Sequence, residues 1–61
     1  MDERFEVVME PSNLWMVWDR EEEEPAIFFN RILGGMSPTE AKAACDLLNH
    51  YDRKQKREAA A

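Results

Sequence analysis

The segment Leu14–Asp19, LWMVWD, has five apolar residues in six positions, and two of them are tryptophans. Its apolar residues do not alternate with polar ones, as they do in a strand with one face in water. Successive side chains of an extended chain point to opposite faces of a sheet. One face would carry Leu14, Met16 and Trp18, and the other would carry Trp15 and Val17. Such a strand needs an apolar cover on each side.

The preceding segment, residues 4–10 (RFEVVME), has the alternation of a half-buried strand. Phe5, Val7 and Met9 fall on one face, and Glu6 and Glu10 fall on the other. The intervening Pro11-Ser12-Asn13 is typical of a tight turn, because proline fixes its own φ and asparagine tolerates a left-handed backbone. The sequence therefore predicts an antiparallel hairpin of strands 4–10 and 14–19.

Beyond this hairpin, residues 20–24 are predicted to form an exposed loop, because four consecutive glutamates repel one another. Residues 25–29 (PAIFF) allow two interpretations. A strand would tolerate Pro25 at its first position. A helix would begin at Pro25 and end at a cap on Gly34. We favour the strand, since a lone hairpin is marginally stable in water and a third strand stabilises it.

The last element is indicated most clearly. Gly34 and Gly35 interrupt the chain, and Ser37-Pro38-Thr39-Glu40 has the pattern of a capping box. No glycine or proline follows, which predicts a helix over residues 38–54 and a frayed tail over 59–61. Its apolar stripe consists of Ala41, Ala44, Cys45, Leu48 and Tyr51, and its polar side of Lys42, Asp46, Asn49 and Arg53.

Together these elements predict an α+β fold: a small antiparallel β-meander of two or three strands, followed by one long C-terminal α-helix packed on one sheet face. One domain would cover residues 1–58. A chain of 61 residues has a thin core, since chains of about 60 residues bury only about 60% of their unfolded surface. With Cys45 and His50 the only residues of their types, neither a disulfide nor a Cys/His zinc site can form within one chain. We expect no metal or cofactor, so packing or association must stabilise the fold.

The charge is unevenly distributed. Residues 1–50 carry eleven acidic and four basic residues, a net of −7, whereas residues 51–61 carry two acidic and four basic residues, a net of +2. An acidic body argues against broad contact with a phosphate backbone. The candidate nucleic-acid contacts are therefore in the basic segment, at Arg53, Lys54, Lys56 and Arg57. The aromatic residues Trp15, Trp18, Phe28 and Phe29 could in addition stack bases from a sheet.

The N-terminal residues MDERFE lack the basic region and apolar run of a signal peptide. No apolar stretch approaches the about 20 residues that cross a membrane. A single cysteine suits a reducing compartment. These features predict a cytoplasmic protein without a membrane partner, and so compact a chain suits a bacterial source.

Three groups of residues are candidates for a chemical site. Cys45 and His50 could act as nucleophile and base, but five residues on a helix set them about 140° apart. Asp46 and His50 lie four residues apart, and two ligands alone do not make a metal site. Glu21–Glu24 with Asp19 lacks the glycine and the ligand spacing of an EF-hand loop. We therefore expect no catalytic residue and no enzymatic activity.

The two apolar strand faces indicate an interaction protein, because a single helix covers one face only. A large exposed apolar patch is unusual in soluble monomers, and a symmetric homodimer would bury it most simply. The candidate interface residues are Leu14, Trp15, Met16, Val17, Trp18, Ile27, Phe28 and Phe29. Two alternatives remain open: a small nucleic-acid-binding regulator that uses the basic segment, and an acidic accessory subunit of a larger complex with another protein as partner.

Overall fold

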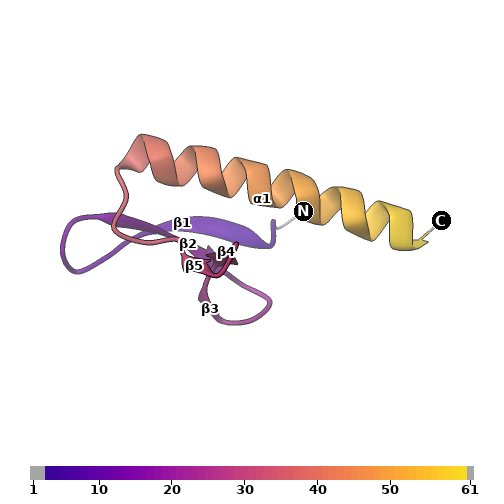
Figure 1. Ribbon diagram of the computed structural model, residues 1–61, viewed down its shortest axis with the longest axis horizontal. Helices are drawn as coiled ribbons and strands as arrows, with labels where there is room; N and C mark the ends of the chain where they lie inside the picture. The colour runs from indigo at the N-terminus through magenta and orange to yellow at the C-terminus, as the bar shows by residue number, and fades with distance from the viewer. Residues whose placement is uncertain (1–2, 61) are drawn as a thin grey trace.

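The computed structural model describes residues 3–60 and confirms the α+β fold (Figure 1). Strands β1 (Phe5–Met9), β2 (Trp15–Asp19) and β3 (Glu24–Pro25) form an antiparallel sheet in that order. Strands β4 (Ile27–Phe28) and β5 (Arg31–Ile32) form a separate small hairpin. Helix α1 (Pro38–Ala60) then runs back across one face of the three-stranded sheet.

The β1–β2 hairpin has the predicted turn. The Glu10 N–H donates to the Leu14 carbonyl at 2.7 Å, and the Asn13 N–H donates to the Glu10 carbonyl at 3.0 Å. Asn13 has a φ of 69°, which places the third loop residue in the left-handed region, as in common three-residue hairpin loops. The resulting register pairs Phe5 with Asp19 and Met9 with Trp15.

The chain that follows β2 returns along the free edge of β2. The Ala26 N–H donates to the Val17 carbonyl at 2.8 Å, and the Val17 N–H donates to the Leu33 carbonyl at 2.9 Å. Further along this edge, Trp15 and Met36 exchange two backbone hydrogen bonds at 2.8 and 2.9 Å. The residues between Ala26 and Leu33 leave the edge of β2 and form the projecting β4–β5 hairpin.

This arrangement corrects the prediction for residues 25–29. The segment is extended, so the helical alternative is wrong, but it is divided between β3 and β4. The division follows from Ala26, whose backbone bonds to both Val17 and Leu33 at the corner where the two sheets meet. Phe29 lies outside both strands, in the turn before β5, with a φ of 50°.

Helix α1 begins at the predicted capping box. The Glu40 N–H donates to Ser37 Oγ at 3.2 Å, and the Ser37 N–H donates to Glu40 Oε1 at 3.3 Å. The helix continues past the predicted end at Lys54 to Ala60, because no helix-breaking residue intervenes. Of the predicted frayed tail, Ala59 and Ala60 are helical, and the last residue lies outside the described part of the chain.

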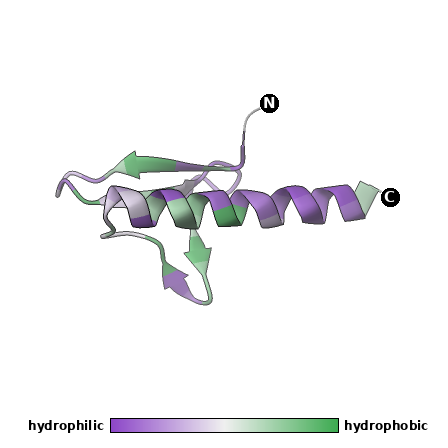
Figure 2. Cartoon of the chain, turned by 90° about the horizontal axis from the view of Figure 1, so that it is seen from above, coloured by the Kyte–Doolittle hydropathy of each residue, from purple (hydrophilic) through white to green (hydrophobic). Residues whose placement is uncertain are grey.

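The core lies between α1 and the sheet. Its buried apolar residues are Val17, Ala26, Ala41, Cys45 and Leu48. The small side chains of Ala41 and Cys45 let the helix approach the sheet closely, and Phe5, Val7, Leu33 and Met36 pack around the core, partly buried. Figure 2 shows the β4–β5 hairpin projecting beside the helix, whose C-terminal half is hydrophilic.

Candidate functional site

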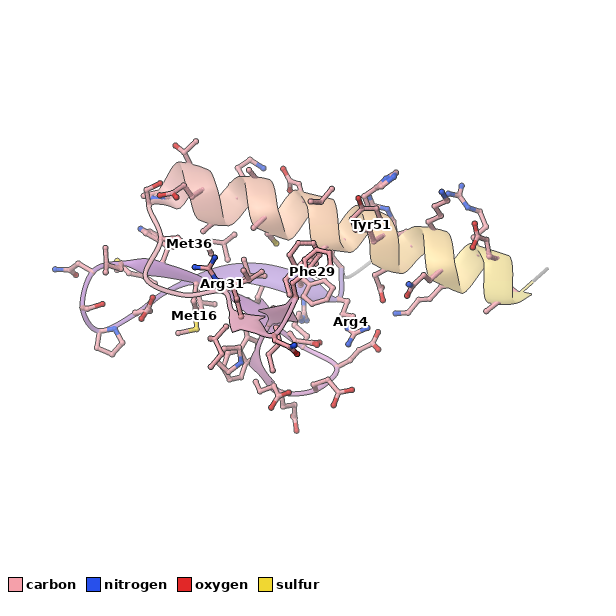
Figure 3. The ribbon with its side chains drawn as sticks, viewed as in Figure 1. Arg4, Met16, Phe29, Arg31, Met36 and Tyr51 are labelled. Carbon is pink, nitrogen blue, oxygen red and sulfur yellow. The ribbon has the colours of Figure 1, made fainter. Side chains whose placement is uncertain are left out.

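The sheet face away from α1 is largely apolar, with Glu6 as a charged member, and α1 does not cover it (Figure 1). Because Val17 faces the helix, alternation turns Met16 and Trp18 to the opposite side, and Figure 3 shows Met16 there. Cross-strand pairing adds Val8 beside Met16, and it places Pro25 on one side of Trp18 and the charged Glu6 on the other. We call this surface the distal face and define it as Val8, Leu14, Met16, Trp18, Pro25, Ile27 and Ile32.

The β4–β5 hairpin extends the distal face into solvent. Ala26 is buried, so alternation turns Ile27 away from the core, and Ile27 pairs directly with Ile32. Ile27 is 57% exposed and Ile32 is 68% exposed. The second strand pair of the hairpin, Phe28 and Arg31, lies on the other side, where Phe28 packs against the core. The hairpin thus has one side in the core and the other in water.

The tip of the hairpin carries an aromatic side chain on a strained backbone. Phe29 and Asn30 have φ values of 50° and 63°, which is the type I′ turn that usually contains Asn-Gly or Asp-Gly. A left-handed conformation costs a residue other than glycine about 1–2 kcal/mol. The Phe29 side chain is also 84% exposed, the largest exposure among the large apolar residues described. Two unfavourable features therefore coincide at one residue.

A groove of about 610 Å³ opens between the hairpin and the start of α1. Its apolar walls include Phe28, Phe29, Leu33 and Met36, and its charged side chains are Arg31 and Glu40. The rings of Phe28 and Phe29 meet edge to face, with centroids 4.5 Å apart. Within residues 3–60 the Arg31 side chain makes no hydrogen bond and no ion pair. A cavity of about 230 Å³ lies on the other side of Phe28, beneath Tyr51.

The predicted interface residues divide into three groups. Leu14, Met16, Trp18, Ile27 and Phe29 are exposed or half-buried on the distal face or the hairpin tip. Trp15 and Phe28 are half-buried on the helix side. Val17 is fully buried beneath α1, so its place in the predicted interface was wrong: it belongs to the core of its own chain. Ile32 was missed, although its place in an apolar stretch could have marked it.

A polar cluster at the opposite end of the sheet holds the helix to the strands. Arg4 Nε and Nη2 donate to the two carboxylate oxygens of Asp19 at 3.0 and 2.9 Å, and Arg4 Nη1 donates to Asp52 at 3.2 Å. Asp19 and Asp52 are buried. The Arg4 hydrogen bonds hold the pKa of Asp19 below its usual value, and the Asp19 hydrogen bond raises the pKa of Arg4. No buried side-chain nitrogen or oxygen atom in residues 3–60 lacks a hydrogen-bond partner.

Asn49 completes this attachment and corrects its predicted position on the polar side of the helix. Its side chain is buried and bonds to both backbone groups of Phe5. The buried residues on the helix face toward the sheet are therefore Ala41, Cys45, Leu48, Asn49 and Asp52, and Ala44 packs beside them, partly buried. The spacing of Asn49, four residues after Cys45, was a signal for this position.

The basic segment is partly neutralised by this chain. Arg53 bonds to Glu3, and Lys56 bonds to Glu21 and, at 3.0 Å, to Asp52. The hydrogen bond to Glu21, and then that to Asp52, raises the pKa of Lys56. Of the four candidate nucleic-acid contacts, Lys54 and Arg57 alone have no ion pair within residues 3–60.

The structure does not bring the residues of the candidate chemical sites together. Cys45 is buried, and burial raises the pKa of its thiol, which disfavours the reactive thiolate. His50 is exposed on another side of the helix, and Asp46 bonds to Lys42 at 3.2 Å. No group of three or more His, Cys, Asp or Glu side chains in residues 3–60 is placed to hold a metal ion. The helix in this range is not apolar enough to span a membrane.

Comparison with known proteins gives no family to which the chain can be assigned. No protein-family model, no curated protein and no solved structure matches it.

Proposed function

We propose that this protein is a non-enzymatic, homodimeric interaction module. The observation that carries this proposal is the distal face together with the hairpin tip, where apolar side chains interrupted by the charged Glu6 are not covered by α1. Ile27, Phe29 and Ile32 are each more than half exposed, although five apolar residues are buried in the core formed by residues 3–60. The hairpin thus presents large apolar side chains to solvent, whereas the core buries mainly small ones.

Burial of this surface would matter to a protein of this size. Withdrawing about 300 Å² of apolar surface per chain contributes about 7 kcal/mol per chain, before the cost of association. Small domains are stable by about 5 kcal/mol. A second copy supplies the same apolar surface, and a two-fold axis brings the two surfaces together. The lone, buried Cys45 is consistent with the proposed cytoplasmic location.

The two alternatives have less support. A nucleic-acid regulator would need free cations, and intramolecular ion pairs engage Arg53 and Lys56. An accessory subunit would use the same distal face for a different protein. In that case the isolated chain would be monomeric, so the oligomeric state separates this alternative from the homodimer.

The proposal is tested by sedimentation equilibrium of the full chain at micromolar concentration. We expect a dimer, and we expect Ile27→Glu to dissociate it. Met9→Glu is the matched control, since Met9 is also 57% exposed but lies on β1 and outside the distal face. A monodisperse monomer for the unmodified chain would contradict the homodimer. If Ile27→Glu and Met9→Glu dissociate the dimer equally, the interface does not lie specifically on the distal face.

A further inference from the structure

The β4–β5 hairpin contains a projecting ring and, beside it, an apolar hollow. Phe29 is 84% exposed at the tip, and together with Phe28 it lines the groove of about 610 Å³. Pockets that hold small ligands have volumes of about 300–1,000 Å³, so this groove has room for a phenyl ring. Because one chain carries both a ring and a groove, two copies could each insert a ring into the groove of the other.

The charges on the groove are likewise complementary to one another. Arg31 and Glu40 both line it, and Arg31 has no side-chain partner within residues 3–60. Glu40 uses Oε1 to accept from the Ser37 N–H, which leaves its other carboxylate oxygen for a further donor. A two-fold axis would place Arg31 of each copy against Glu40 of the other, so the dimer would contain two such ion pairs.

The backbone at the tip supports a role in recognition. A type I′ turn of Asn-Gly would connect β4 to β5 without strain. The chain instead holds Phe29 in the left-handed region, at a position where its ring is in water. Strained residues that the rest of the fold maintains occur preferentially at functional sites. Aromatic and arginine side chains, as found here at Phe29 and Arg31, also dominate the binding energy of many interfaces.

From these observations we infer that the occupant of the groove is the hairpin tip of a second copy: Phe29 of each chain enters the groove of its partner, and Arg31 pairs with the partner's Glu40. This inference rests on the proposed homodimer and names the residues that make its contacts. Figure 3 shows Phe29 and Arg31 on the β4–β5 hairpin below the helix, with Arg31 to the left and Phe29 to the right.

The ring is tested with two turn variants and sedimentation equilibrium. Phe29→Asn removes the ring and keeps a residue that tolerates the left-handed backbone, so we expect the dimer Kd to rise at least about tenfold. Asn30→Gly is the matched control, because it relaxes the same turn and keeps the ring, and its Kd should stay within about twofold. An unchanged Kd in Phe29→Asn would overturn the inference. So would an equal rise in both variants.

The charge pair is tested by mixing two variants. Arg31→Glu places two acids across the interface, and Glu40→Arg places two bases there, so each variant alone should be mainly monomeric. In a 1:1 mixture every contact again joins opposite charges, and the heterodimer should form with a Kd near that of the original chain. Circular dichroism of each variant checks that the helix remains, since Glu40→Arg removes a capping side chain.

The outcomes separate this inference from the proposed function. If the original chain is a monomer, both are wrong. If it is a dimer that Ile27→Glu dissociates, while Phe29→Asn and the two charge variants dimerise normally, the homodimer stands and the exchange of hairpin tips is wrong. If both charge variants are monomeric and their mixture stays monomeric, the pairing of Arg31 with Glu40 is wrong.

Discussion

The side chain of Asn49 pairs with both backbone groups of Phe5. Asn49 Oδ1 accepts a hydrogen bond from the Phe5 N–H at 2.8 Å, and Asn49 Nδ2 donates to the Phe5 carbonyl at 3.0 Å. Both Phe5 groups point outward from β1, since the neighbouring Arg4 carbonyl accepts from the Arg20 N–H on the β2 side. A helix side chain thus occupies one position of an open strand edge and fixes the helix on β1 at the same time.

Replacement of this amide should be costly. Asn49→Leu leaves a donor and an acceptor of Phe5 without partners, which we expect to lower the free energy of unfolding by about 1–3 kcal/mol. The measurement is urea denaturation at one fixed protein concentration, because association also affects stability. The exposed neighbour variant His50→Leu should change the free energy by less than about 0.5 kcal/mol. Hydrogen exchange of the Phe5 amide that stays slow in Asn49→Leu would contradict this account.

Arg4 is expected to tolerate no conservative exchange. Lysine has no planar guanidinium group, so it cannot donate to both oxygens of Asp19 and to Asp52 at the same time. We expect Arg4→Lys to lower the free energy of unfolding by about 1.5–3 kcal/mol. Arg20→Lys is the control, because Arg20 is exposed and lies 3.5 Å from Glu6 in a surface ion pair. Thermal unfolding of the two variants provides the comparison. Equal decreases in Tm would show that the guanidinium geometry of Arg4 is unimportant.

Acid should destabilise the protein through Asp19. Its pKa in the folded state lies below the usual value because Arg4 donates to its charged form. The unfolded-state value is about 3.9, so this contribution is fully present above about pH 4 and is lost as the pH falls through the lower folded-state pKa. Unfolding free energies measured from about pH 5 to pH 2 should therefore fall more steeply for the original chain than for Asp19→Asn. Parallel curves would contradict the prediction.

Local signals in the sequence predicted the parts of the fold that form locally. Pro11-Ser12-Asn13 and the box from Ser37 to Glu40 specify a turn and a helix start through adjacent residues, and both are present. The spacing of Asn49 from Cys45 indicates the buried side of the helix, but its polar side chain led to a prediction on the polar side, because its partner is a backbone edge 44 positions away. A helical wheel that considers apolar residues alone cannot indicate the strand edge at Phe5.

The hairpin tip was difficult for a different reason. Phe29-Asn30 is not a usual type I′ sequence, so residues 25–29 were predicted as one strand. Apolar content did place Ile27 and Phe29 among the candidate interface residues. The groove beside them depends on the distant start of α1 and on Glu40, which no spacing within the sequence indicates.

The two adjacent glycines should respond oppositely to the same substitution. Gly35 has a φ of 64°, so Gly35→Ala forces a left-handed alanine and should lower the free energy of unfolding by about 1–2 kcal/mol. A Cβ on Gly34 would meet its nearest atom, Glu10 Oε2, at 3.5 Å, an ordinary contact. Gly34→Ala should thus be neutral or stabilise by up to about 1 kcal/mol, because alanine restricts the unfolded chain. Urea denaturation of both variants at one concentration tests this difference, and a larger loss for Gly34→Ala than for Gly35→Ala would refute it.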